Sequence, residues 1–162
     1  MDFLNQEKYK VEVEEGINSM INIRTKTEII KLEKASNIVK EVLFEIENLV
    51  KPGISTIELD SYAENFIVSK GGIPAFKGYR GLPASLCTSI NEEVVHGIPG
   101  KRILKDGDIV SIDCGVKKEG YYGDSAYTYP VGKISIEKEK LLNVTKECLY
   151  MGLEFLNSSF RL

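Results

Sequence analysis

Apolar residues recur every three or four positions over residues 25–50, and this spacing predicts an amphipathic helix. Thr25 and Glu28 at its start match the Thr-x-x-Glu capping box, in which two residues satisfy each other's backbone N–H groups. A Lys-Pro-Gly sequence at residues 51–53 predicts the end of the helix, because proline cannot continue the ladder of hydrogen bonds. Apolar spacing of the same kind over residues 136–156 predicts a further helix.

A second helix is predicted to begin at Ser55, with Glu58 in the capping-box position, and Gly71 and Gly72 close it. Only a short connection separates it from the first helix. Two amphipathic helices with such a connection favour an antiparallel pair laid on a sheet. Residues 1–24 are charged and weakly patterned instead, and they predict a partly ordered arm.

The middle of the chain changes from helical to strand-like patterning. Glycine and proline mark turns over residues 73–100, with a short strand predicted at about residues 86–91. Two β-rich runs around a polar, glycine-containing break then predict a hairpin over residues 108–131. Its first strand has one apolar face and one small, polar and acidic face: Val110, Ile112, Cys114 and Val116 against Ser111, Asp113 and Gly115. The second face suits a site better than a core.

Two aspartates occupy related positions on the two strands of this hairpin. With the turn centred between Lys118 and Glu119, Asp113 would lie directly opposite Asp124. Directly opposed like charges destabilise a sheet, whereas a divalent cation between the carboxylates would reverse the sign of that interaction. The alternative is a pair of solvated turn acids in a slipped register. The spacing alone leaves both interpretations open.

The composition of the 162-residue chain is that of one globular domain, with 43% hydrophobic and 28% charged residues. A net charge of −3 provides no general attraction to nucleic acid or anionic membranes, and no basic stripe interleaved with aromatics predicts nucleic-acid binding. Three cysteines without Cys-x-x-Cys spacing indicate free thiols in a reducing compartment. No secretory signal and no apolar stretch of about 20 residues is visible, so we expect a cytoplasmic protein without a membrane span.

His96 is the single histidine, and it lies between the predicted strand at residues 86–91 and a Gly-Ile-Pro turn. A lone histidine is more often a surface or structural residue than a catalytic one. Loops next to rigid strands commonly carry function, however, and an imidazole there could bind a metal, move a proton or donate to a substrate carbonyl. Both interpretations are open on the residue type and position alone.

Three segments carry a resemblance to a known family. They are GYRGLPASLCTSINEEVVHGIP at residues 78–99, LKDGDIVSIDCGV at residues 104–116 and GDSAYT at residues 123–128. In this order they resemble the signature of type I methionine aminopeptidases, and residues 27–36 and 50–60 are also similar to that family. The similarity extends over about residues 24–156. The chain therefore resembles the N-terminal half of such a domain, assigned here to residues 25–162, with the arm at residues 1–24 outside it.

The resemblance implies the pita-bread fold, an α+β architecture of two pseudo-symmetric halves around a curved antiparallel sheet. It implies a metalloprotease that removes the initiator methionine from nascent peptides through attack by a metal-activated hydroxide. Its cofactors would be two divalent metal ions (Co, Mn, Fe or Zn), held in part by Asp113 and Asp124. His96 matches the family histidine that contacts the substrate near the scissile bond, and Tyr79 and Cys87 fall where the family lines its methionine pocket.

The family also requires a further histidine and two further glutamates from the second half of its fold, and no matching motif follows Tyr129 in this chain. Three interpretations result. The chain is the N-terminal half of a methionine aminopeptidase, or it is an inactive, truncated remnant that binds a ribosomal surface or a nascent chain. The third interpretation is a homodimer in which two copies imitate the pseudo-symmetric whole.

Overall fold

The computed structural model describes residues 22–158, so the predicted arm at residues 1–24 falls almost entirely outside the described residues. The first helix, α1 (Lys26–Glu47), begins where the capping box predicts. Thr25 N donates to Glu28 Oε2 over 2.8 Å, and Glu28 N donates to Thr25 Oγ1 over 3.3 Å. These bonds satisfy backbone groups that the first turn of a helix otherwise leaves unpaired, so the sequence fixes this start locally.

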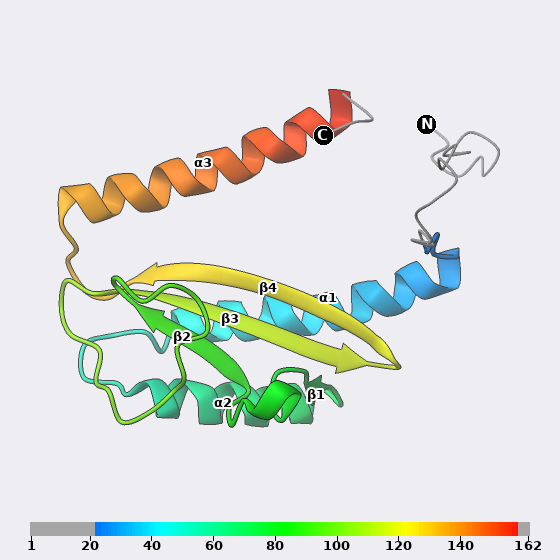
Figure 1. Ribbon diagram of the computed structural model, residues 1–162, viewed down its shortest axis with the longest axis horizontal. Coiled ribbons are helices and arrows are strands. Elements are labelled where there is room, and N and C mark those ends of the chain that lie inside the picture. Colours follow the sequence, from blue (N-terminus) through cyan, green and yellow to red (C-terminus); the bar gives the residue numbers. More distant parts are fainter. Residues whose placement is uncertain (1–21, 159–162) are drawn as a thin grey trace.

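The second helix, α2 (Thr56–Ser69), also has its predicted capping box, in which Ser55 N donates to Glu58 Oε2 over 2.8 Å. Together α1 and α2 cover one face of the sheet (Figure 1). The hydrophobic core between helices and sheet contains the predicted apolar face of the hairpin: Val110, Ile112, Cys114 and Val116, all completely buried. Burial of this stripe against α1 and α2 removes apolar surface from water and stabilises the packing of helices on sheet.

An antiparallel sheet forms the second layer, and β3 (Ile109–Lys118) is its central strand. β2 (Leu86–Ile90) and the two-residue β1 (Ile73–Pro74) pair with one side of β3, and β4 (Tyr121–Pro130) pairs with the other. A 3₁₀ turn at Tyr79–Gly81 lies between β1 and β2. The α+β class, the short strand and the hairpin predicted from the sequence are confirmed.

The turn of the hairpin differs from the prediction by one residue. It consists of Glu119 and Gly120, with φ angles of 51° and 85°. A type I′ turn needs two left-handed residues, and it strongly favours glycine at the second. The predicted centre between Lys118 and Glu119 would have put glycine outside the two turn positions, and it is wrong.

The same difference overturns the predicted opposition of the two aspartates. Asp113 lies opposite Ala126, and Asp124 lies opposite Gly115. The shift moves each pairing by two residues, which preserves the alternation of faces. Asp113 and Asp124 therefore remain on one face of the sheet, as diagonal rather than direct neighbours.

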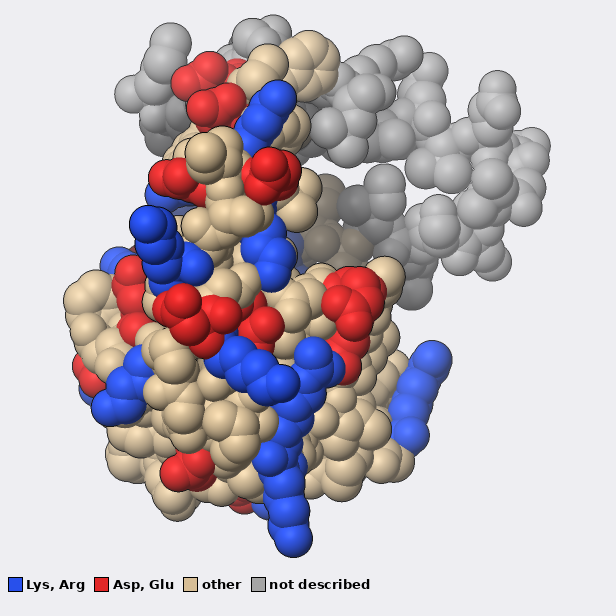
Figure 2. All heavy atoms as spheres, turned by 90° about the vertical axis from the view of Figure 1, so that its left-hand side faces the viewer, with Lys and Arg blue, Asp and Glu red and all other residues tan. Residues whose placement is uncertain are grey.

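The third helix, α3 (Ile136–Ser158), extends away from the sheet instead of packing on it (Figure 1). Its described apolar side chains are largely exposed, among them Leu141, Val144, Leu149, Met151 and Leu153. In its first turn, Lys138 Nζ donates to Asn91 Oδ1 over 2.9 Å and to Gly107 O over 2.6 Å. Over residues 22–158, no helix combines the length and the hydropathy that a membrane crossing requires. Figure 2 shows acidic and basic side chains interleaved on one face, so the charge of that face is mixed.

Candidate functional site

The open face of the sheet, opposite α1 and α2, carries the acidic pair. Asp113 is partly buried on β3, and Asp124 is exposed on the adjoining β4. Burial is the largest cause that raises the pKa of Asp113, and the charge of Asp124 and a hydrogen bond with it raise that pKa further. The charge of Asp124 thus disfavours the ionised form of Asp113. A bound cation would reduce the repulsion between the two carboxylates, because it attracts both negative charges.

His96 lies on the loop between β2 and β3, which folds back against the outer edge of β2. Thr88 N donates to Gly97 O over 2.7 Å, and Gly97 N donates to Ser89 Oγ over 3.1 Å. A Cβ atom at residue 97 would overlap the Thr88 carbonyl, so this approach requires glycine. Val95 and His96 adopt positive φ angles of 24° and 60°. Such strained residues persist only where their surroundings hold them, which means that the loop fixes the His96 backbone.

The loop places the His96 ring beside two residues of the sheet. Cys87 on β2 lies directly opposite Asp113 on β3, on the open face. The Cys87 Sγ atom lies 3.8 Å from His96 Nδ1. One ligand atom from each of the three side chains lies within 4.8 Å of the other two. Burial raises the pKa of the Cys87 thiol, and the Asp113 charge raises it further. A thiol, an imidazole and a carboxylate thus form one cluster.

Tyr79 is the predicted site residue that the structure leaves apart from this cluster. It lies in the 3₁₀ turn, its side chain is 63% exposed, and the Arg80 guanidinium lies 5.5 Å from the centre of its ring. Of the five predicted residues, the structure therefore brings together Cys87, His96 and Asp113, with Asp124 adjoining them. The role of Tyr79 in a substrate pocket stays a prediction.

Phe76 borders the carboxylate pair, although the sequence analysis did not single it out. Its ring lies so close to β3 that a Cβ atom at residue 115 would be 2.5 Å from Phe76 Cε1. Because Gly115 lies opposite Asp124, this ring covers the open face next to the acidic pair. A glycine inside a strand is a signal of close approach, and Gly115 was a signal of this kind in the sequence.

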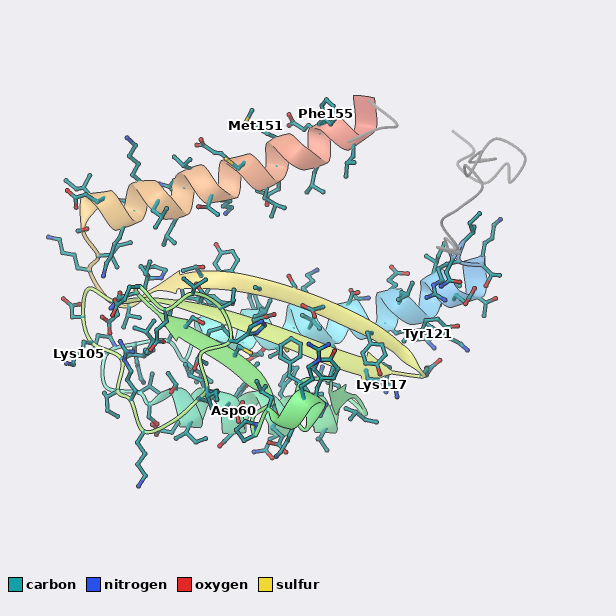
Figure 3. All side chains as sticks on the ribbon, viewed as in Figure 1. Asp60, Lys105, Lys117, Tyr121, Met151 and Phe155 are labelled. Atoms are coloured by element: carbon teal, nitrogen blue, oxygen red, sulfur yellow. The ribbon has the colours of Figure 1, made fainter. Side chains whose placement is uncertain are left out.

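Asp60 on α2 is the second residue that the sequence analysis missed (Figure 3). This buried carboxylate accepts hydrogen bonds from Ser85 N over 2.9 Å and from Leu86 N over 2.8 Å. Burial raises the pKa of Asp60, and the two backbone donors oppose that effect. Asp60 fixes the start of β2 and hence the position of Cys87 one residue further along.

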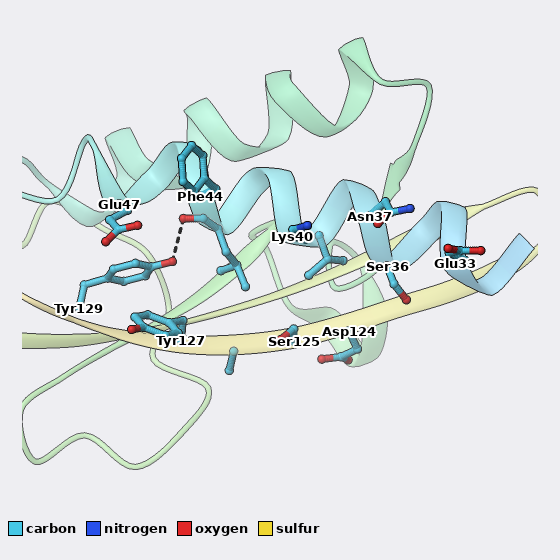
Figure 4. Close-up of a pocket in the computed structure, with 13 residues that line it drawn as sticks. Glu33, Ser36, Asn37, Lys40, Phe44, Glu47, Asp124, Ser125, Tyr127 and Tyr129 are labelled. Atoms are coloured by element: carbon cyan, nitrogen blue, oxygen red, sulfur yellow. Dashed lines mark hydrogen bonds between the residues drawn. The ribbon is translucent and has the colours of Figure 1, made fainter. Parts of the chain in front are cut away.

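A groove of about 550 Å³ lies elsewhere, between α1 and β4 (Figure 4). Lys40 and Phe44 of α1 and Tyr127 and Tyr129 of β4 are among the residues that line it. The Tyr129 hydroxyl donates to Leu43 O over 2.8 Å, which ties β4 to the helix. Asp124 lies in the lining, but the cluster around His96 does not.

Comparisons with known proteins agree with this arrangement. A family model described as Metallopeptidase family M24 matches residues 30–160. Methionine aminopeptidase 1 of Bacillus subtilis is 56% identical over 135 residues, which are 83% of this chain and 54% of the relative. A methionine aminopeptidase of Clostridium acetobutylicum is 53% identical over 136 residues, with the same two shares. The chain spans about half the length of the curated relatives it matches.

Solved structures of the same kind share the fold. The crystal structure of a methionine aminopeptidase from Thermotoga maritima has a TM-score of 0.80 and 41% identity, covering 82% of this chain and 53% of that one. The corresponding structure from Rickettsia prowazekii has a TM-score of 0.78 and 44% identity, covering 79% and 52%. Over the shared part, the described residues have the architecture of the pita-bread proteins. Since the family model also matches most of its residues, the chain belongs to metallopeptidase family M24, which implies a divalent metal cofactor.

Proposed function

We propose that residues 25–162 supply the N-terminal half of a methionine aminopeptidase, a metal-dependent hydrolase that removes the initiator methionine from nascent peptides. The observation that carries the proposal is the convergence of Asp113, Asp124 and His96 on one open face of the sheet. Carboxylates for a cation and a histidine for the peptide group are what metal-assisted peptide hydrolysis requires. The 56% identity with a methionine aminopeptidase supports this choice of reaction.

The acidic pair fits a divalent cation. Asp113 and Asp124 offer hard, anionic oxygen ligands. Burial first and the charge of Asp124 second raise the pKa of Asp113, and a cation would offset the repulsion between the two carboxylates. Two ions, drawn from Co, Mn, Fe and Zn, belong to the proposal. When bound, such ions polarise a substrate carbonyl and lower the pKa of water. Asp113 and Asp124 would hold such ions from neighbouring strands, and the β-ladder fixes the backbones of both residues.

His96 is proposed to contact the peptide group of the substrate. Its backbone is held by the Thr88–Gly97 hydrogen bond, so the loop places the residue beside the acidic pair before the substrate arrives. A ring N–H can donate to the carbonyl oxygen, on which negative charge develops during hydrolysis. The role of His96 is therefore to orient the peptide and to stabilise that charge.

Cys87, Tyr79 and Phe76 are proposed to line the pocket for the methionine side chain. Burial raises the pKa of Cys87, which keeps the thiol neutral and suited to an apolar wall. The Phe76 ring over β3 provides a second wall, and a polarisable thioether packs well on aromatic surfaces. Tyr79 would have to turn toward the site, because its side chain is 63% exposed.

A second candidate function is partner binding through β4. Phe44 and Tyr127 are 65% and 45% exposed beside this ten-residue strand, whose outer side has no strand partner among residues 22–158. Unpaired N–H and C=O groups on an edge strand are a template for another chain. A ribosomal surface, a nascent chain or a second copy would be the partner in this case.

Methionine release from a Met-Ala-Ser peptide with Mn²⁺ or Co²⁺ tests the proposal. We expect little release by the 162-residue chain and robust release by a chimera that continues it with the unmatched part of the Bacillus subtilis relative. In the chimera, Asp113→Asn should lower kcat/KM by more than about 100-fold, because it removes a charged metal ligand. Glu119→Gln on the same hairpin is the matched control, since it changes only an exposed ion pair with Lys34.

Equal activity of Asp113→Asn and Glu119→Gln would refute the metal assignment. A chimera that is folded and binds metal but releases no methionine would favour the binding function instead.

A further inference from the structure

The cluster of Cys87, His96 and Asp113 has a donor set that differs from the acidic pair. It offers one sulfur, one imidazole nitrogen and one carboxylate oxygen, all within 4.8 Å of one another. Thiolate and imidazole select borderline ions such as zinc, whereas carboxylates alone suit harder ions. Cys87 and His96 therefore add a sulfur and a nitrogen ligand to this part of the open face, which the carboxylates of Asp113 and Asp124 cannot provide.

The spacing of these atoms is close to that of a metal site. Zinc bonds of about 2.3 Å to sulfur and about 2.0 Å to nitrogen, at a tetrahedral angle, put the two ligand atoms about 3.5 Å apart. The Cys87 Sγ and His96 Nδ1 atoms are 3.8 Å apart. The longest separation in the cluster, at most 4.8 Å, can shorten through rotation of the His96 side chain, which is exposed.

The three backbones are also fixed independently of any metal. Cys87 and Asp113 are direct partners in the β2–β3 ladder, so their Cα atoms cannot separate without breaking the sheet. His96 is held by the bonds of Gly97 to β2. Metal binding then has to order only side chains, and a preorganised site binds more tightly than one that must be assembled.

We propose that Cys87, His96 and Asp113 form a distinct site for a single zinc-like ion, which shares Asp113 with the acidic pair. The Cys87 thiol loses its proton to solvent when the ion binds, and His96 binds through Nδ1. A fourth coordination position stays open to water. Occupation of this site takes one carboxylate of the acidic pair and removes His96 from contact with a substrate.

The consequence for activity rests on the proposed function, but the site itself does not. If the chain supplies half of an aminopeptidase, an ion at Cys87, His96 and Asp113 competes with the catalytic ions for Asp113. Excess zinc would then inhibit where Mn²⁺ activates. The Cys87→Ser variant of the chimera should resist this inhibition, because the remaining two ligands bind zinc weakly.

Cobalt absorption on the full 162-residue chain tests the site without an activity assay. Co²⁺ is a spectroscopic stand-in for zinc, and a cobalt–thiolate bond produces a charge-transfer band that carboxylate ligands do not. We expect this band in the wild type and its displacement by Zn²⁺. Cys87→Ser should abolish it, and both Cys87→Ser and His96→Ala should weaken zinc binding at least about 10-fold, measured by competition with a chromogenic chelator.

Two variants control for the exposed thiol and for the acidic pair. Cys148→Ser removes the exposed thiol on α3 and should leave the band unchanged. Asp124→Asn removes the other half of the acidic pair and should also retain the band. Circular dichroism establishes that each variant is folded.

A wild type that binds Co²⁺ without the band would overturn the proposal. So would a band that survives Cys87→Ser, or one that disappears in Asp124→Asn. An inactive chimera would count against the proposed function alone, because the absorption of the 162-residue chain does not depend on turnover.

Discussion

β2 and β4 flank the same central strand, yet their outer edges differ. Every residue of β2 is buried, and the loop that follows it bonds to its outer edge through Thr88 and Gly97. Within β4 only Gly123 and Tyr129 are buried, and no strand pairs with its outer edge among the residues that the structure describes. The loop thus covers the outer edge at β2, which we call the completed side of the sheet. The outer edge at β4 has no strand partner among the described residues, and we call it the open side. Both names refer to edges of the sheet, whereas the open face is the surface opposite α1 and α2.

The same difference separates the residues of the proposed site into two groups. The cluster of Cys87, His96 and Asp113 is on the completed side, where a covering loop and a β-ladder hold each backbone. Asp124 is on the open side, exposed and next to a groove. A further layer along β4 would bury it. Substitutions should therefore be costly on the β2 side and mild on the β4 side.

The contact of Gly97 with β2 offers the strongest way to break this comparison. In Gly97→Ala the new methyl group would overlap the Thr88 carbonyl, so the loop has to move, and the hydrogen bonds of Gly97 with Thr88 N and Ser89 Oγ weaken. We expect a loss of about 2–4 kcal/mol in the free energy of unfolding. Gly100→Ala in the same loop is the matched control, because the nearest atom to its new Cβ lies 4.0 Å away. Urea titration measures both, and an equal cost would mean that the loop does not seal β2.

Asp60 provides the second test on the completed side. Asp60→Asn replaces a buried carboxylate, which accepts hydrogen bonds from two backbone N–H groups, with an amide. We expect it to lower the free energy of unfolding by about 1–2 kcal/mol near pH 4. Burial raises the folded-state pKa above its unfolded value of about 3.9, so the native chain holds the extra proton between those two pKa values. The stability of the wild type relative to Asp60→Asn should therefore fall as pH rises through that window and become constant above it.

Unfolding titrations of both proteins over this pH range measure the difference directly, because the other titrating groups cancel. A wild-type advantage that grows with pH would show that the two backbone donors outweigh burial and lower the pKa of Asp60.

The elements with local causes could be predicted from the sequence. The capping boxes of Thr25 and Ser55 fixed two helix starts, because both partners lie within one turn. The alternation along β3 identified the apolar face and the face of Asp113, because a strand has a period of two. These predictions hold because each depends on residues that are close together in the chain.

The remaining features depend on where the chain folds back. The hairpin register was missed because the turn was centred before Glu119, although Gly120 suits the left-handed second position. The contact between Cys87 and His96 was not predicted, since it needs the loop to reverse against β2. Gly97, read only as part of a turn, was the one local signal of that close approach.

On the open side, Tyr129 should show a smaller effect. Tyr129→Phe removes the hydroxyl that donates to Leu43 O, and we expect a loss of about 1 kcal/mol in the free energy of unfolding. Tyr127→Phe is the matched control on the same strand and should change stability by less than about 0.5 kcal/mol, since its side chain is 45% exposed. Thermal and urea unfolding give both values. A cost for Tyr129→Phe as large as that for Gly97→Ala would remove the contrast between the two sides.

The hairpin turn should show the smallest effect, and its sign tests the register on which the site depends. Glu119 holds a φ angle of 51°, which costs most side chains more than it costs asparagine, and Asn-Gly is the preferred pair for a type I′ turn. Glu119→Asn should therefore raise the midpoint of thermal unfolding by about 1–2 °C. It also removes the exposed ion pair with Lys34, and Lys34→Gln measures that loss separately. A lower midpoint for Glu119→Asn than for Lys34→Gln would indicate that the turn does not use Glu119 and Gly120. Asp113 and Asp124 would then no longer be the diagonal neighbours on which the proposed metal site is based.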